Sequence, residues 1–148
     1  MIYKVSKTFG HNEGLSCCFR QWRADSHCNL LHGYALAVSF SLKSNELDHK
    51  NWVYDFGSFK KIKELLHFWF DHTTLVAKDD PELQTFVMLN DKKLINLKII
   101  DHVGCEKFAE FIYKESCKLI PEFEYILDSV MVSEHNSNGA IFSKGDYE

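Results

Sequence analysis

The segment from Cys28 to Tyr34 brings together several residue types that could carry out chemistry. A thiol and an imidazole, Cys28 and His32, lie four residues apart, and Gly33 follows where the backbone must turn. Alternate side chains of a strand point to one face, so we expect His32 and Tyr34 to share a face. Such a group could supply a base, a metal ligand and a phenol. The structural alternative is a buried thiol beside a hydrogen-bonded histidine.

Two further positions carry side chains suited to proton transfer or ligand binding. Asp71 directly precedes His72 at a predicted helix end, where a carboxylate can orient an imidazole and raise its basicity. Glu134 lies at a predicted strand end, where its carboxylate could accept hydrogen bonds from a ligand. Each residue also has a structural interpretation, as a helix-end charge, a solvated turn residue or a surface charge. Taken singly, none of them identifies a site.

The composition predicts one globular domain over residues 1–148. Hydrophobic residues make up 45% of the chain, which is long enough to bury a core. The net charge of −4 argues against a nucleic-acid partner, which would require a basic face. No apolar run approaches about 18 residues and no export leader is recognisable, so we expect no membrane span and no secretion. The five cysteines, an odd number without zinc-ribbon spacing, predict reduced thiols in the cytoplasm.

Hydrophobic periodicity predicts an α+β fold. Alternation indicates strands, and we expect segment 52–56 to pair with strand 34–42 as a hairpin. Apolar residues at helical spacing indicate amphipathic helices. The predicted strands are 2–9, 15–20, 34–42, 52–56, 97–100, 125–134 and 140–142, and the predicted helices are 58–70, 81–89 and 105–119. This order favours a four-stranded antiparallel sheet with two helices on one face.

In chain order, these residues resemble the 6-pyruvoyltetrahydropterin synthase family, whose bacterial branch includes 6-carboxytetrahydropterin synthase. The family's Cys-x-x-x-His-Gly-His segment corresponds to 28–34, and its Asp-His pair corresponds to Asp71 and His72. The family's Asp-Phe pair corresponds to Asp55-Phe56, and its first-strand pattern corresponds to Leu15–Arg20. Its two glutamates correspond to Glu106 and Glu134. The resemblance covers nearly the full chain. Segments 2–9 and 76–103 are specific to this branch.

The resemblance implies a tunnelling fold, in which three subunits close their sheets into a barrel, commonly stacked as a hexamer. It also implies a lyase acting on 7,8-dihydroneopterin triphosphate, as in 7-deazaguanine (queuosine-type) biosynthesis. Cys28, Asp71 and His72 would be catalytic, with the cysteine and the Asp-His pair contributed by different chains. Glu134 and Glu106 would bind the pterin. A zinc ion held by three histidines would act as a Lewis acid.

The chain departs from the family at the zinc ligands. Of the three histidines, only His32 is present, because Tyr34 replaces the second and Phe19 stands in the first-strand position. A catalytic zinc ordinarily has three protein ligands, so zinc is either lost or bound by other residues. The nearby candidate ligands are His27, then Cys17, and after them Cys18 and His11. Their spacing does not select among them.

Two functions therefore stand as hypotheses. The first is a zinc-dependent lyase, which the retained Cys28, Asp71, His72 and Glu134 favour. The second is a metal-free pterin- or purine-binding protein on the same fold, which the aromatic residues in place of zinc ligands favour. In either case we expect a homo-oligomer, a trimer or hexamer, in which strands 34–42 and 125–134 are exposed edges that pair across subunits.

Overall fold

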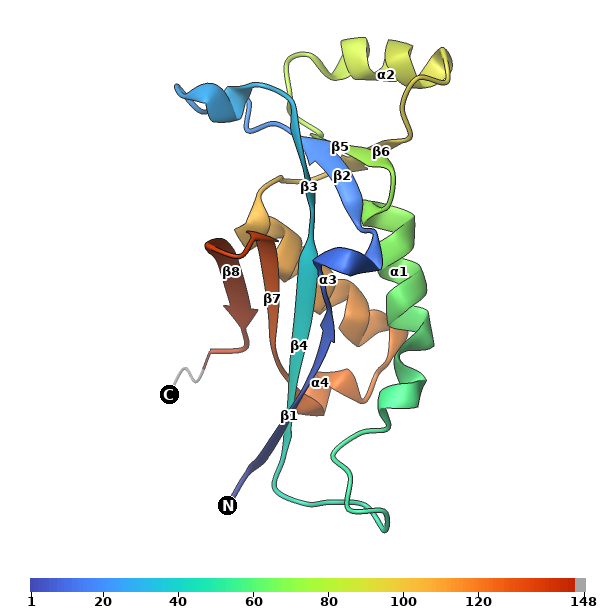
Figure 1. The fold of residues 1–148 in the computed structure, drawn as a ribbon, viewed down its shortest axis with the longest axis vertical. Helices are drawn as coiled ribbons and strands as arrows, with labels where there is room; N and C mark the ends of the chain where they lie inside the picture. Colours follow the sequence, from blue (N-terminus) through green and yellow to red (C-terminus); the bar gives the residue numbers. More distant parts are fainter. Residues whose placement is uncertain (146–148) are drawn as a thin grey trace.

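The computed structural model describes residues 1–145 and contains two β-sheets, one above the other along the long axis of the molecule (Figure 1). The strands are β1 (Tyr3–Phe9), β2 (Ser16–Phe19), β3 (His32–Ala35), β4 (Ala37–Ser44), β5 (Thr73–Ala77), β6 (Leu97–Ile100), β7 (Leu127–His135) and β8 (Asn138–Ser143). The helices are α1 (Lys60–Phe70), α2 (Leu83–Asp91), α3 (Cys105–Leu119) and α4 (Phe123–Ile126), and the 3₁₀ turns are η1 (His11–Glu13), η2 (His27–Asn29) and η3 (Phe56–Phe59). No helix within residues 1–145 is long and apolar enough to cross a bilayer.

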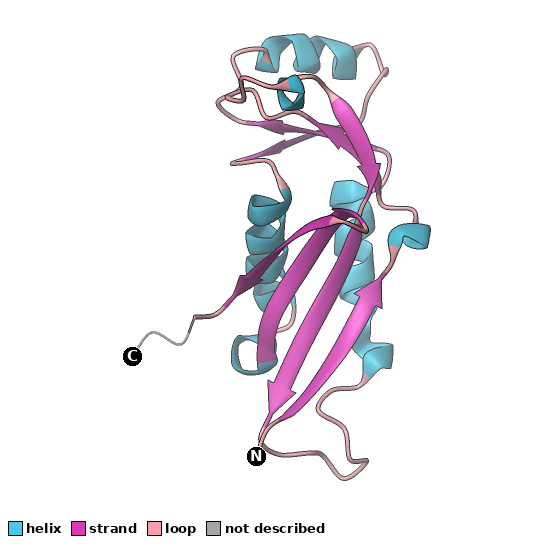
Figure 2. Cartoon of the chain, turned by 60° about the vertical axis from the view of Figure 1, so that its left-hand side comes forward, coloured by secondary structure: helices cyan, strands magenta, loops and turns pink. Residues whose placement is uncertain are grey.

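The larger sheet is antiparallel and has the strand order β1-β4-β7-β8. Helices α1 and α3 stand side by side behind one face of it (Figure 2). Along β4, Val38, Phe40 and Leu42 are fully buried toward these helices, while the serines between them face the other way. This arrangement confirms the predicted α+β fold with a four-stranded sheet covered by two helices.

The smaller sheet has the order β3-β2-β5-β6 and was not predicted. Strand β2 pairs antiparallel with β3, while β2 with β5 and β5 with β6 are parallel. Parallel neighbours need a crossover connection, and α2 provides it between β5 and β6, at the top of the molecule (Figure 1). Segment 76–103 therefore extends this sheet by one strand. The predicted strand 97–100 and helix 105–119 are confirmed.

Helix α3 connects the two sheets through a cluster of aromatic rings. Phe108 is fully buried and packs edge-on against Phe19 of β2, with ring centroids 5.0 Å apart. On its other side it contacts Phe70 of α1 at 5.3 Å. Because aromatic side chains bury large areas, this cluster fixes the smaller sheet against the helical layer.

Strand 34–42, predicted to be continuous, is divided at Leu36. The preceding residues form β3 in the smaller sheet, and the following residues form β4 in the larger one. Leu36 itself is fully buried, and its backbone N–H donates to the carbonyl of Leu15 at 2.9 Å. Periodicity continues smoothly across this crossing, so alternation alone cannot reveal it.

Two other predictions about strands are wrong. Segment 52–56 forms no strand, because local side chains occupy its backbone donors. The Asp48 carboxylate accepts the N–H of Trp52 at 3.0 Å, and Asp55 accepts the N–H of Gly57 at 2.8 Å, which caps η3. The edges of the larger sheet are β1 and β8, whereas β4 and β7, the strands expected at the edges, form its central pair.

Candidate functional site

The residues predicted to do chemistry fall into two groups, and the first surrounds the pairing of β2 with β3. In this register Phe19 lies opposite His32, and Cys17 lies opposite Tyr34, so their side chains share one face. The ring centroids of His32 and Tyr34 are 5.3 Å apart, and Phe19 lies 5.4 Å from His32 and 6.0 Å from Tyr34. The expected common face of His32 and Tyr34 is confirmed.

Glu134, near the end of β7, joins this group through two hydrogen-bond donors. Its carboxylate interacts with the Tyr34 hydroxyl and with the Cys105 thiol at the start of α3. Burial, and then the charge of Glu134, raise the pKa of Tyr34 and raise the pKa of Cys105 to about 12. Both groups therefore keep their protons at neutral pH. The other predicted pterin ligand, Glu106, follows Cys105 and is exposed in the first turn of α3.

Cys28 lies on η2 and is half-buried. Its backbone carbonyl accepts the N–H of Gln21 at 2.9 Å, and its own N–H donates to the Ser26 hydroxyl at 3.3 Å. The Cys28 charge also acts on the titration of Tyr34, which places the two residues in one neighbourhood. His27, beside it, is exposed.

A buried ion pair holds the η2 loop in place. The Arg20 guanidinium donates to both carboxylate oxygens of Asp80, at 2.9 and 2.7 Å, and Asp80 is 4% exposed. Its remaining nitrogen donates to the Asn29 side-chain oxygen at 3.1 Å. Burial opposes ionisation of Asp80, but hydrogen bonds from Arg20 and from the backbone of Glu82 outweigh it and lower the pKa of Asp80. Arg20 thus connects Asn29, the residue after Cys28, to Asp80 in segment 76–103.

The second group lies at the opposite end of β2. The Asp71 carboxylate is 2.5 Å from Nδ1 of His72, and the His72 side chain is 88% exposed. His72 has a left-handed backbone with φ of 54°, and its N–H donates to the carbonyl of Ser16 at 2.6 Å. Within residues 1–145, no described contact joins this pair to Cys28 or Glu134. One chain therefore keeps the predicted acid-base residues apart.

The family model for 6-pyruvoyl tetrahydropterin synthase matches residues 9–145. The chain belongs to this family. A search of curated protein sequences gives no match.

Solved structures share the fold of this family member at low sequence identity. An uncharacterized protein from Wolinella succinogenes is 19% identical, with a TM-score of 0.84 over 98% of this chain and 99% of that chain. The 6-pyruvoyl tetrahydropterin synthase of Caenorhabditis elegans is 17% identical, with a TM-score of 0.63 over 98% and 96%. That of Plasmodium vivax is 16% identical, with a TM-score of 0.70 over 97% and 98%. At these identities the likeness shows the fold.

The residues of this family member do not fit the zinc ion that the family implies. Among residues 1–145, no group of three or more His, Cys, Asp or Glu side chains could hold a metal ion. Burial raises the pKa of the Cys17 thiol to about 12, which disfavours the thiolate that zinc requires. His32 directs Nδ1 to the Leu30 carbonyl at 2.6 Å and has the rings of Phe19 and Tyr34 beside it. The structure does not bring His32, His27 and Cys17 together as a ligand set.

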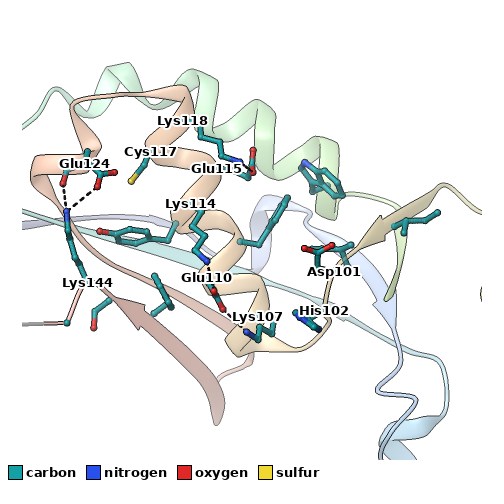
Figure 3. A pocket seen from close by; sticks show the side chains of 18 residues that line it. Asp101, His102, Lys107, Glu110, Lys114, Glu115, Cys117, Lys118, Glu124 and Lys144 are labelled. Atoms are coloured by element: carbon teal, nitrogen blue, oxygen red, sulfur yellow. Dashed lines mark hydrogen bonds and ion pairs between the residues drawn. The ribbon is translucent and has the colours of Figure 1, made fainter. Parts of the chain in front are cut away.

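A cavity of about 1120 Å³ lies on the outward side of α3, and none of the eight predicted site residues lines it. Most of its charged residues pair with one another, as Figure 3 shows for Glu110, which lies between Lys107 and Lys114. Lys144 similarly pairs with Glu124 at 3.2 Å. Despite its size, this cavity contributes nothing to the group around Cys28 and Glu134.

Sequence reasoning missed two kinds of site residue. Asp80 is 60 positions from Arg20, and no local pattern indicates a pair so distant in sequence. His67, in contrast, precedes Asp71 by four residues on a predicted helix, a spacing at which side chains meet. Its ring nitrogen lies 2.9 Å from the Asp71 carboxylate. That signal was available in the sequence.

The buried pair predicts a marked difference between two neighbouring aspartates. Asp80→Asn should lower the free energy of unfolding by about 2–4 kcal/mol, because it leaves a largely buried guanidinium without its counter-charge. Asp79→Asn, the matched control, should cost less than about 1 kcal/mol, since its pair with Arg23 is exposed. Denaturant unfolding at neutral pH measures both.

The contribution of Asp80 should also depend on pH. Because the pKa of Asp80 is lowered by folding, its stabilisation is present above the ordinary aspartate pKa and is lost as the pH falls through the depressed value. Equal losses for the two variants, or a loss for Asp80→Asn that does not shrink in acid, would contradict this account.

Proposed function

We propose that this protein is a cytoplasmic lyase of the 6-carboxytetrahydropterin synthase type. Its substrate would be 7,8-dihydroneopterin triphosphate, and its product would enter 7-deazaguanine biosynthesis. The observation that carries the proposal is the contact of 2.5 Å between Asp71 and Nδ1 of His72, on a ring that is otherwise exposed. A carboxylate that orients a solvent-facing imidazole is an arrangement suited to general acid-base chemistry.

Each residue then has a defined task at the substrate. Asp71 accepts a hydrogen bond from Nδ1–H of His72, which leaves Nε2 free to take or return a proton at the pterin side chain. Cys28 is the second proton-transfer group. The carboxylate of Glu134 accepts the N–H groups along the edge of the pterin, since it has more acceptor positions than Tyr34 and Cys105 occupy. No step of this proposal passes through a metal.

The proposal requires two copies of the chain at one active site. Cys28 and His72 lie at opposite ends of β2 in one chain, and residues at the two ends of a strand of this length are about 10 Å apart. The outer strands of the larger sheet, β1 and β8, each leave one edge without a neighbouring strand. Pairing of these edges around a closed ring would remove both open edges and give a trimer, or a hexamer of two rings.

Mixing two inactive variants tests the shared site. Cys28→Ala and His72→Ala should each abolish turnover of 7,8-dihydroneopterin triphosphate. After the two are unfolded together and refolded as mixed oligomers, about a quarter of the wild-type activity should return, because a quarter of the sites combine both intact residues. Separately refolded variants are the control. Mixed oligomers without activity would overturn a site shared between chains.

The pterin anchor gives a separate prediction from binding. Glu134→Gln should weaken pterin binding at least tenfold, because an amide presents a donor to the N–H edge and the charged partner is lost, at a cost of about 1.5–3 kcal/mol. Calorimetric titration with a reduced pterin measures this. Glu110→Gln, which removes a surface carboxylate paired with two lysines on α3, should leave binding unchanged. Unchanged affinity in Glu134→Gln would remove Glu134 from the site.

A second candidate function is a metal-free pterin- or purine-binding protein. The specific observation in its favour is the aromatic group of Phe19, His32 and Tyr34, with the ring of His135 6.2 Å from Tyr34. Flat heteroaromatic ligands stack on such rings where a face is accessible, as on His32, Tyr34 and His135, whereas Phe19 is buried beneath them. In this candidate, Glu134 would still bind the ligand edge, but Asp71 and His72 would have no chemical role.

Metal analysis separates the two candidates from a zinc enzyme. Protein purified without chelators should contain zinc well below one ion per chain, because the described donors form no three-ligand group. One bound zinc per chain, released by the double change His27→Ala and Cys17→Ala, would restore the zinc-dependent lyase. Turnover by metal-free protein favours the first candidate, and pterin binding without turnover favours the second.

A further inference from the structure

His67 of α1 lies between two carboxylates, one at each ring nitrogen. Its Nδ1 is 2.9 Å from an oxygen of Asp71, and its Nε2 is 3.0 Å from an oxygen of Glu13 on η1. The same oxygen of Glu13 is 3.3 Å from the ammonium of Lys63. Lys63, Glu13, His67, Asp71 and His72 therefore form one continuous chain of polar contacts that ends at the exposed imidazole.

The geometry determines the charge of His67. A neutral imidazole has one N–H donor and one lone pair, whereas an ionised carboxylate only accepts. With a carboxylate at each nitrogen, a neutral ring would direct a lone pair at one of them. Only the imidazolium donates to both, and charge-assisted hydrogen bonds of this kind are the stronger ones.

We propose that His67 is a positioning residue: as an imidazolium, it fixes the Asp71 carboxylate so that His72 carries its proton on Nδ1 and presents Nε2 outward. This inference rests on the proposed role of His72 as the proton-transfer group. One oxygen of Asp71 is held by His67 and the other faces His72, so the carboxylate has little freedom to rotate. The ring of His72, which packing does not restrain, takes its orientation from Asp71 and from its own backbone bond to Ser16.

Shifts in acidity along the chain of contacts are consistent with this assignment. Hydrogen bonds to Glu13 and then Asp71 raise the pKa of His67 above its ordinary value. The hydrogen bond with His67 is the main cause that lowers the pKa of Glu13. It is also the main cause that lowers the pKa of Asp71, and the hydrogen bond with His72 is the second. Lys63 contributes further to the shift at Glu13. Glu13 of η1 and Asp71 after α1 are thus the charged groups in contact with His67, and Lys63 acts on it only through Glu13.

The direction of the shifts defines a pH window. The carboxylates contribute stability above their ordinary pKa values and lose it as the pH falls through their lowered ones. The His67 contribution is complete below its ordinary pKa and is lost as the pH rises through the raised one. The network is therefore intact from weak acid to about neutral pH and loosens on the alkaline side, when His67 gives up its proton.

Imidazole ¹⁵N spectroscopy of the full chain tests the inference without any substrate. Near neutral pH, His67 should show both nitrogens protonated, and His72 should show its proton on Nδ1. His67→Gln removes the cation, so the Nδ1 tautomer of His72 should lose its dominance. His67→Lys, whose ammonium reaches Asp71 across one helical turn, should restore it. His49→Gln, a change in the exposed loop between β4 and η3, is the matched control and should leave the His72 spectrum unchanged.

Kinetics supply the second readout. His67→Gln should lower kcat about tenfold with little change in KM, because the base is misplaced while the ligand-binding groups are untouched. Glu13→Gln keeps His67 but removes its stronger partner, so the alkaline limb of the pH–rate profile should move to lower pH. If His67→Gln fails to fold, the Glu13→Gln variant still tests the positioning role of His67.

The outcomes distinguish the inference from the proposed function. If His72→Ala retains full turnover, the proposed function fails, whatever the spectra show. If His72→Ala is inactive but His67→Gln leaves both the His72 tautomer and kcat unchanged, the positioning role is wrong. A neutral His67 in the wild-type spectrum near neutral pH would overturn it directly.

Discussion

The structure depends on how the short strand β2 is paired. It is hydrogen-bonded on one side to β3 in antiparallel register and on the other to β5 in parallel register. At one end, Phe19 lies opposite His32, and at the other, the Ser16 carbonyl accepts the N–H of His72. The two groups of candidate site residues are therefore fixed relative to one another by four residues of backbone. Because Phe19 also packs on Phe108 of α3, a shift of this strand would disturb both groups and the core together.

The two groups are built on different electrostatic principles. Around Glu134, the neighbours Tyr34 and Cys105 are neutral donors, since burial and the adjacent carboxylate raise their pKa values. The Glu134 carboxylate thus faces two groups that stay protonated and can donate to it. Around Asp71, the partners are cations or can become cations, and the pKa of Asp71 is lowered. The first environment suits recognition of a planar donor edge, and the second suits proton transfer.

The sequence predicts the layers of this fold better than its sheets. Helix 105–119 and strand 97–100 follow from periodicity and turn signals, because burial along one face determines which residues are apolar. The division of 34–42 at Leu36 could not be predicted this way, since Leu36 is buried and fits the alternation on both sides of the crossing. The site shows the same contrast. Tyr34 and His32 share a face as a strand requires, whereas the Arg20–Asp80 pair depends on tertiary contacts that no local spacing encodes.

The backbone conformation of His72 is held by polar contacts and not by packing of its ring. A non-glycine residue with φ of 54° costs on the order of 1 kcal/mol, and His72 adopts it directly between α1 and β5. Packing of the ring does not offset this cost, since the side chain is 88% exposed. The offset comes instead from the polar chain that runs through Asp71 and His67 to Glu13, and from the backbone bond to Ser16. Four polar groups thus hold in place an imidazole that contributes nothing to the core, as expected if its free nitrogen is the part that the fold must present.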